Sequence, residues 1–146
     1  MASRAMPAAL LLIVAALVLC ACSSAAADER ISASILVEPS PGDARWFRDV
    51  TVDVGTDGYE LLGAATAGQF EADWFPQLRS HFVTSLLGTP SEGSRFWLTF
   101  VWDEPSGAWQ PLPTGADFFS VKDGHVFGWA LLDTSSGAAQ LPASQP

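Results

Sequence analysis

Cysteine and positive charge are both scarce in these 146 residues. The two cysteines, Cys20 and Cys22, lie together near the start, so the rest of the chain has no disulfide and must be stabilised by a packed core. Seven Lys and Arg stand against 16 Asp and Glu, which gives a formal net charge of −9. Because such an acidic surface repels polyanions, we expect no nucleic acid partner and no electrostatic binding to anionic lipid.

Catalytic and metal-binding signatures are also missing. The chain has no Gly-x-Ser-x-Gly elbow, no His-Glu-x-x-His motif, no P-loop, no Gly-x-Gly-x-x-Gly fingerprint and no EF-hand calcium loop. The two histidines, His81 and His125, are far apart in sequence, and Ser80 beside His81 has no evident acid partner. The sequence therefore predicts a protein without enzymatic activity and without a metal site.

The first 22 residues have the pattern of a secretory signal. Arg4 precedes an apolar run of about 12 residues, 8–19, which is too short to span a bilayer as a mature helix. The run ends in Leu19-Cys20-Ala21-Cys22, which matches a bacterial lipobox and predicts diacylation of Cys22. The alternative is ordinary cleavage near residues 25–27. We expect an exported lipoprotein, anchored to the outer face of the cell membrane through its lipid, with residues 23–30 as a tether.

The remaining chain has room for one domain, which we place at residues 31–133, followed by a Ser-, Gly- and Pro-rich disordered tail, 134–146. One helix is expected over 59–69, with Asp57 or Thr56 as N-cap and Gly68 as terminator, and an acidic aromatic loop is expected over 71–76. The expected strands are 31–37, 49–54, 80–87, 96–102 and one or two short runs after residue 115. This order predicts an α+β fold of the β-grasp type, a mixed sheet packed on one helix.

The strand predicted over 96–102 is apolar on both faces. Phe96, Leu98, Phe100 and Trp102 share one face, while Trp97, Thr99 and Val101 share the other. A single helix covers only one face of a sheet. The second face is therefore either additional core or a surface that receives a ligand or partner.

Five segments, taken in order, resemble the C-terminal domain of the transcobalamin and intrinsic factor proteins. The similarity extends from about Ile31 to Asp133. The matching segments are Asp57-Gly58-Tyr59-Glu60-Leu61-Leu62-Gly63-Ala64-Ala65, Phe82-Val83-Thr84-Ser85-Leu86-Leu87-Gly88, Phe96-Trp97-Leu98-Thr99-Phe100, Gly115-Ala116-Asp117-Phe118-Phe119-Ser120-Val121-Lys122-Asp123-Gly124 and Trp129-Ala130-Leu131. The resemblance implies a β-grasp related to soluble ligand-binding domains, with cobalamin or another corrinoid as ligand.

The same resemblance implies a set of ligand-facing residues. They are Trp97, Phe100, Trp109, Phe118 and Phe119, and we add Asp117, whose side chain is expected to brace its loop by accepting backbone N–H groups. The alternative for the first two is that they are simply core. Trp109, flanked by Gly107 and Pro111, is the preferred candidate for an exposed contact.

Two functions follow as expectations. The first is a membrane-anchored extracytoplasmic domain that binds a corrinoid together with a partner protein, since the helical barrel of the vertebrate carriers has no counterpart in these residues. The second is a protein- or polysaccharide-interaction module of the cell envelope with no small-molecule ligand.

Overall fold

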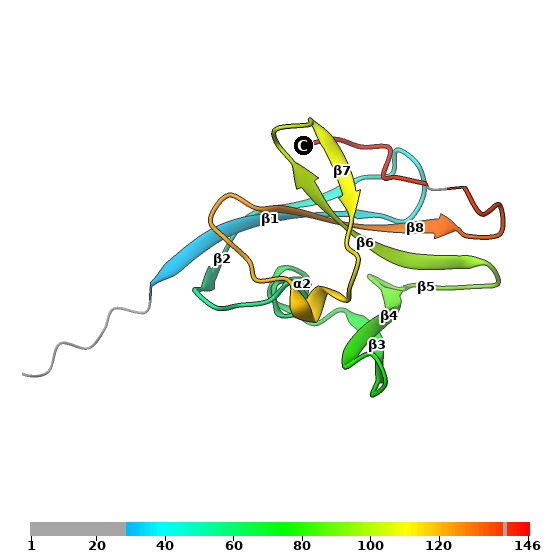
Figure 1. The fold of residues 1–146 in the computed structure, drawn as a ribbon, viewed down its shortest axis with the longest axis horizontal. Coiled ribbons are helices and arrows are strands. Elements are labelled where there is room, and N and C mark those ends of the chain that lie inside the picture. Colours follow the sequence, from blue (N-terminus) through cyan, green and yellow to red (C-terminus); the bar gives the residue numbers. More distant parts are fainter. Residues whose placement is uncertain (1–28, 139) are drawn as a thin grey trace, which may run out of the picture.

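The computed structural model describes residues 29–138 and 140–146, and strands predominate in it (Figure 1). The predicted signal peptide, the lipobox Cys22 and most of the predicted tether lie outside the described residues. In order, the elements are β1 (Arg30–Glu38), β2 (Arg45–Asp53), α2 (Gly58–Thr66), β3 (Phe70–Phe75), β4 (Ser80–Leu86), β5 (Thr89–Pro90), β6 (Arg95–Asp103), β7 (Ala108–Pro111), the 3-10 turn η2 (Ala116–Phe118) and β8 (Val126–Asp133). None of the helices in this described part is long and apolar enough to cross a membrane.

A five-stranded mixed sheet forms the centre of the domain, in the order β2-β1-β8-β6-β7. Strands β1 and β8 pair in parallel, with Ile35 opposite Phe127, whereas the other neighbours are antiparallel. The first and last strands of the domain are thus hydrogen-bonded side by side. The expected α+β class with a mixed sheet is confirmed.

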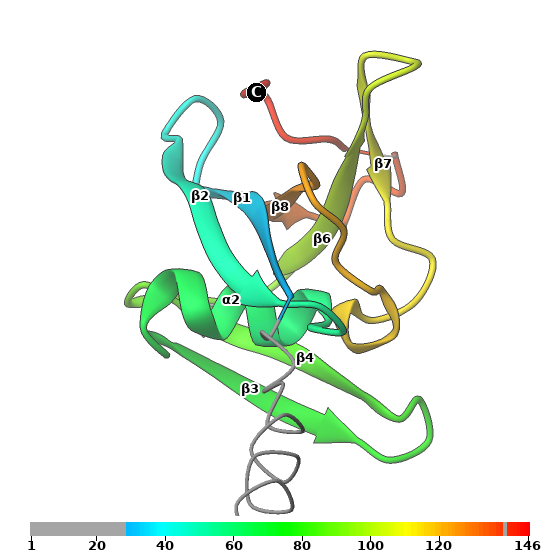
Figure 2. The ribbon, with the colours of Figure 1, turned by 90° about the vertical axis from the view of Figure 1, so that its left-hand side faces the viewer.

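Helix α2 lies between the five-stranded sheet and a second sheet, β3-β4-β5 (Figure 2). Its apolar side chains Leu61 and Leu62 are fully buried, and they join one hydrophobic core with residues of both sheets, among them Val83 and Trp129. The N-cap is Asp57, one of the two residues predicted for it, and it forms a capping box with Glu60. The Asp57 carboxylate accepts the Glu60 N–H at 2.8 Å, and the Glu60 carboxylate accepts the Asp57 N–H at 3.1 Å.

Two predictions were wrong at this place in the chain, the end of the helix and the loop over 71–76. The helix is shorter than 59–69, because Ala67 takes a left-handed conformation (φ 52°) and Gly68 donates back to the Gly63 carbonyl at 3.0 Å. The segment expected as a loop over 71–76 forms strand β3 instead. It pairs with β4 through a turn over residues 76–79, in which Arg79 also has a positive φ of 51°.

The opposite face of the five-stranded sheet carries a second, smaller core. It consists of Leu36, Phe100, Trp109, Ala130 and Leu132. Each face of β6 therefore contributes to a core, Trp97 to the first and Phe100, with the partly buried Leu98 and Trp102, to the second, as the predicted alternation of these residues requires.

Residues 140–146 contribute to the cover of this second face, which differs from the expected disordered tail. The backbone N–H groups of Ala143 and Ser144 donate to the buried carboxylate of Glu38, both at 2.9 Å. Pro142 is buried. A composition rich in small and polar residues predicts disorder only where the backbone finds no partner, and here a buried acid supplies one.

Candidate functional site

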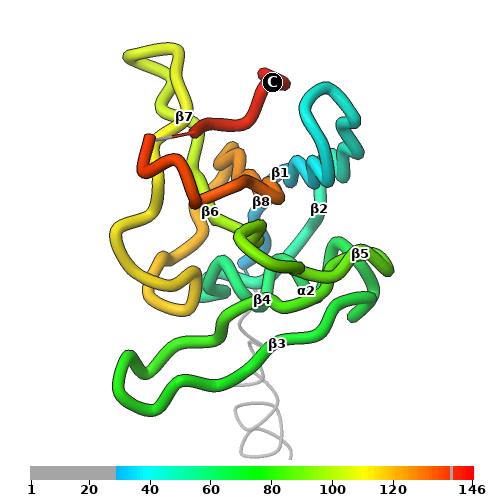
Figure 3. Tube along the Cα trace, turned by 90° about the vertical axis from the view of Figure 1, so that its right-hand side faces the viewer, coloured from blue at the N-terminus to red at the C-terminus, as the bar shows by residue number. Residues whose placement is uncertain are grey.

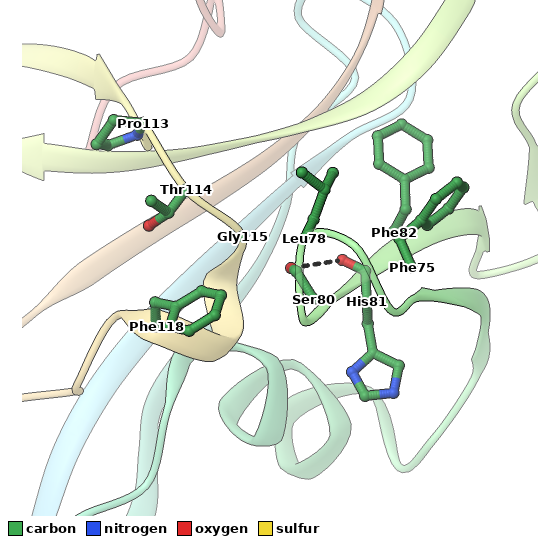
Figure 4. A pocket seen from close by; sticks show the side chains of 9 residues that line it. All are labelled: Phe75, Leu78, Ser80, His81, Phe82, Pro113, Thr114, Gly115 and Phe118. Carbon is green, nitrogen blue, oxygen red and sulfur yellow. Dashed lines mark hydrogen bonds between the residues drawn. The ribbon is translucent and has the colours of Figure 1, made fainter.

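An apolar cleft of about 500 Å³ lies between the β3–β4 hairpin and the segment that connects β7 to η2. Figure 4 shows its two walls, with residues 113–118 on one side and the hairpin on the other. The residues that line it are Phe75, Leu78, Ser80, His81, Phe82, Pro113, Thr114, Gly115 and Phe118. A volume of this size falls within the range of small-molecule sites in proteins.

The hairpin wall follows from the alternation of side chains along β4. Phe82 faces the cleft side and contacts Phe75 edge to face, with 6.1 Å between ring centroids. The His81 ring points away from the cleft toward the helix (Figure 4), where it stacks on Tyr59 with 4.1 Å between centroids and contacts Trp74 at 4.8 Å. Only the strand position of His81, and not its ring, belongs to the cleft wall.

Large apolar side chains remain exposed around the cleft. Phe118 is 53% exposed, Leu78 is 68% exposed and Phe75 is 43% exposed. Isolated exposed apolar residues are ordinary, but several grouped at one concavity indicate a contact surface.

The Asp117 carboxylate ties the two walls together. It accepts hydrogen bonds from the Ser80 hydroxyl at 2.8 Å and from the His81 backbone N–H at 3.0 Å, and its second oxygen bonds the His81 Nδ1 at 2.5 Å. Partial burial acts to raise the pKa of this carboxyl. The bonds from His81 and Ser80 outweigh burial, so the Asp117 pKa lies below its ordinary value of 3.8.

The close approach of the walls requires a glycine at position 115. A Cβ placed on Gly115 would lie 1.5 Å from the Ser80 Oγ and 2.7 Å from the Ser80 Cβ. The 3-10 turn that follows is held on the helix side by two backbone bonds, Gly58 N–H to Phe119 O at 3.0 Å and Val121 N–H to Thr56 O at 2.9 Å. These contacts position the Phe118 side chain at the cleft.

Two acidic groups at the start of the helix, beside this turn, have raised pKa values. Burial, chiefly, raises the pKa of Asp57, and the nearby carboxylates of Glu60 and Asp117 add to the shift. Burial also raises the pKa of the Tyr59 phenol, with further contributions from Asp117 and Asp57. The Tyr59 phenol therefore stays neutral at physiological pH.

The arrangement of Ser80, His81 and Asp117 supplies the acid partner that was not evident in the sequence, but not a nucleophile–base pair. Both the serine hydroxyl and the imidazole Nδ1 bond the same carboxylate. A Ser nucleophile is activated by a base that takes its proton directly, and a carboxylate shared in this way acts as a brace instead. Among the described residues, no group of three or more His, Cys, Asp and Glu is placed to hold a metal ion.

The structure separates the predicted ligand-facing residues into core and surface. Trp97 is 2% exposed and donates its indole N–H to Thr89 O at 2.9 Å, and Phe100 is fully buried on the opposite face of β6. Trp109, expected as an exposed contact, is 3% exposed, with its indole N–H on Ser144 O at 2.8 Å. Phe119 is half-buried against Phe127 at 5.6 Å.

Of that predicted set, Phe118 alone lines the cleft. Asp117 was expected to brace its loop through backbone N–H groups, and the structure gives it one such group, from His81, together with the side chains of Ser80 and His81 on β4. Sequence reasoning missed the hairpin wall, Phe75, Leu78 and Phe82, because β3 was taken for a loop. The available signal was the turn over 76–79, which joins an aromatic run to the strand already predicted from residue 80.

Taken together, fold and site define a strand-rich α+β domain with an open apolar cleft at a hairpin. No protein-family model and no curated protein sequence matches this chain. Among solved structures, haptocorrin in complex with Cbi is similar with a TM-score of 0.60 at 16% identity, over 73% of this chain and 26% of haptocorrin. A "putative metal binding protein" from Ruminococcus gnavus is similar with a TM-score of 0.55 at 16% identity, over 70% of this chain and 97% of that protein. At such identities the likeness is one of fold, and this chain corresponds to about a quarter of haptocorrin.

Proposed function

We propose that this chain is an exported ligand-binding domain of β-grasp type whose apolar cleft takes a flat macrocyclic ligand of the corrinoid class. The observation that carries the proposal is the cleft itself, with Phe118, Phe75 and Leu78 exposed around it. Haptocorrin, which shares the fold, binds cobinamide, a corrinoid. An aromatic and aliphatic wall suits the apolar face or edge of a macrocycle.

The cleft is open, so it shelters one part of such a ligand. A second body, either a partner protein or a transporter, would cover the remainder and add the buried area that tight binding requires. The isolated domain is therefore expected to bind in the micromolar range, which corresponds to roughly 8 kcal/mol.

Titration of the domain with cobinamide and with cobalamin tests the proposal, with quenching of tryptophan fluorescence as the readout. Phe118→Ala removes an exposed ring of the cleft and is expected to weaken binding by about 1–2 kcal/mol, roughly 5–30-fold. Val54→Ala is the matched control, since Val54 is also a large exposed apolar residue (55%) but does not line the cleft. Absence of saturable quenching at micromolar corrinoid, or equal affinities of the two variants, would refute corrinoid binding at this cleft.

A second candidate is a module that docks on an envelope protein or polysaccharide. Trp74 favours it, because this half-exposed indole (51%) lies beside the His81 ring, on the face of the β3–β4 hairpin away from the cleft, and offers a contact surface of its own. Retention on immobilised envelope polysaccharide that is lost in Trp74→Ala but kept in Phe118→Ala would support this function over corrinoid binding.

Anchoring through Cys22 is part of the first proposal and has its own test. The lipobox at 19–22 supports it. Cells fed a labelled fatty acid should label the wild-type chain and leave Cys22→Ala unlabelled, with that variant moving from the membrane to the soluble fraction. Labelling of both chains, or of neither, would overturn the lipid anchor.

A further inference from the structure

A second site lies on the outer face of the five-stranded sheet, away from the cleft. There the segment Leu141–Pro146, named here the 141–146 segment, runs between β7 and the turn that joins β1 to β2 (Figures 2 and 3). Pro142 is buried in this groove, while the side chains of Leu141 and Ala143 are exposed.

The floor of the groove contains a buried carboxylate, that of Glu38. Glu38, the last residue of β1, is 2% exposed. Its two carboxylate oxygens each accept one backbone N–H, from Ala143 and from Ser144, both at 2.9 Å. The 141–146 segment thus both covers this carboxylate and satisfies its two oxygens, and a carboxylate covered without such donors would be strongly unfavourable.

Trp109 forms the wall. Its indole N–H donates to the Ser144 carbonyl at 2.8 Å, and its ring packs so closely on β8 that a Cβ on Gly128 would lie 3.1 Å from it. The indole is thereby fixed in the orientation that meets the peptide. Residue 144 is held at both its N–H and its C=O.

All three hydrogen bonds engage the backbone of the occupant and none engages a side chain. Two successive N–H groups and one carbonyl are features of any extended peptide without proline at those positions. The buried ring of Pro142 is then the side-chain feature by which the groove would select one peptide over another. The groove therefore has the chemistry of a peptide-binding site, in which proline is followed by two residues of little restricted identity.

The chain that follows β8 is first fixed at Thr134, whose N–H and hydroxyl both donate to the Ser94 carbonyl at 2.9 Å. Residues 134–138 are all exposed, and a cavity of about 400 Å³ lies between this stretch, with Leu141, and the sheet residues Leu98, Phe100 and Leu132. Between Thr134 and Pro142 the described residues, 135–138, 140 and 141, are thus exposed. The contacts of the 141–146 segment with Glu38 and Trp109 are therefore the ones that hold it.

We propose that the groove of Glu38 and Trp109 is a binding site for an extended peptide of the form proline followed by two non-proline residues, and that the 141–146 segment is its resident, exchangeable ligand. This site is independent of the corrinoid cleft, and the failure of either proposal leaves the other standing. Tethering gives the resident segment an effective concentration on the order of millimolar, so a competing peptide enters only when it binds more tightly or when the tether is cut.

The experiment uses the full chain with a protease site in place of residues 135–138. The probe is a fluorescently labelled peptide with the sequence of residues 140–146, followed by polarisation at micromolar chain. The uncut chain should take up no probe. After cleavage the segment should exchange, and the probe should bind saturably.

Matched peptides distinguish backbone recognition from general stickiness. N-methylation at the residues equivalent to Ala143 and Ser144 removes both donors to Glu38 and should weaken uptake by about tenfold or more. A peptide with serine in place of the exposed Ala143 should bind as the parent does.

Three results would overturn the proposal. They are a cut chain that stays folded by circular dichroism but neither releases its segment nor takes up the probe, a cut chain that unfolds, and an N-methylated peptide that binds as well as the parent. The first two would make the 141–146 segment a fixed part of the core, and the third would remove the role of Glu38.

Discussion

Substituting Gly115 by alanine isolates the contact that brings the two walls of the cleft together. Gly115 has φ −60° and ψ 156°, an extended conformation that alanine adopts without strain. Any loss of stability therefore comes from the added methyl group. That group would lie 1.5 Å from the Ser80 Oγ and 2.7 Å from its Cβ, so Ser80 or the 113–118 wall must move.

The expected cost combines two terms. Forcing a methyl group into a closely packed contact costs about 1–3 kcal/mol, and displacing the Ser80 hydroxyl from the Asp117 carboxylate removes a charge-assisted hydrogen bond worth about 1.5–3 kcal/mol. Because the site is partly exposed and the wall can relax, we expect a total of about 2–4 kcal/mol. Urea unfolding followed by tryptophan fluorescence measures it.

Gly63→Ala is the matched control. Gly63 lies inside α2, where the nearest atom to an added Cβ is a Phe70 ring carbon at an ordinary 3.9 Å. Alanine is the better helix former by about 1 kcal/mol, so this variant should be more stable than wild type. A Ser80→Gly background removes both atoms that clash with the new methyl, and there Gly115→Ala should cost less than about 1 kcal/mol. If Gly115→Ala changed stability by less than 0.5 kcal/mol, or if Ser80→Gly gave no relief, the reasoning about this contact would be refuted.

Three further substitutions test the rest of the architecture. Gly128→Ala places a methyl 3.1 Å from the Trp109 ring and should cost about 1–3 kcal/mol in urea unfolding, and no loss would show that the ring has room to move. Because the pKa of Asp117 is lowered, its stabilising contribution is complete above its ordinary pKa of 3.8 and is lost as pH falls below that value. Unfolding free energies measured from pH 7 to pH 3 should therefore fall more steeply in wild type than in Asp117→Asn, and parallel curves would contradict the brace. The raised pKa of Asp57 acts with the opposite sign, and because the Asp117 charge is one of its smaller causes, behind burial, this opposing effect differs little between the two proteins. Asp57→Ala removes the capping box with Glu60 and should cost about 1 kcal/mol in thermal or urea unfolding, whereas an unchanged midpoint would mean that tertiary packing alone holds the helix start.

Much of the fold was predictable because its signals are local. The alternation over 96–102 depends on a period of two residues, and the N-cap at Asp57 on the residue type that precedes a helical pattern. The error over 71–76 has the same origin. Acidic and aromatic residues next to Pro76 resemble a loop, and only pairing with β4 shows that they extend a hairpin.

The candidate site was predictable only in part. Phe118 and Asp117, both in the predicted set, lie at the cleft. Trp109, the preferred exposed contact, lies in the core, and so do Trp97 and Phe100, for which the core was the stated alternative. An apolar residue in a strand has the same sequence pattern whether a ligand or another part of the chain covers it. The cover is decided by elements far away in sequence.

The amino-acid sequence by itself determined the α+β class, the helix start and the two apolar faces of β6, since each follows from neighbours within a few residues. Tertiary structure alone decided which faces stay open. The 141–146 segment reaches Glu38 across more than one hundred residues and contributes to the cover of one face. Asp117 bonds His81 and Ser80 across 36 and 37 residues and so connects the two walls of the cleft, which stays open. Burial is a property of the partners that meet in space, and no periodicity in the chain records which partners those are.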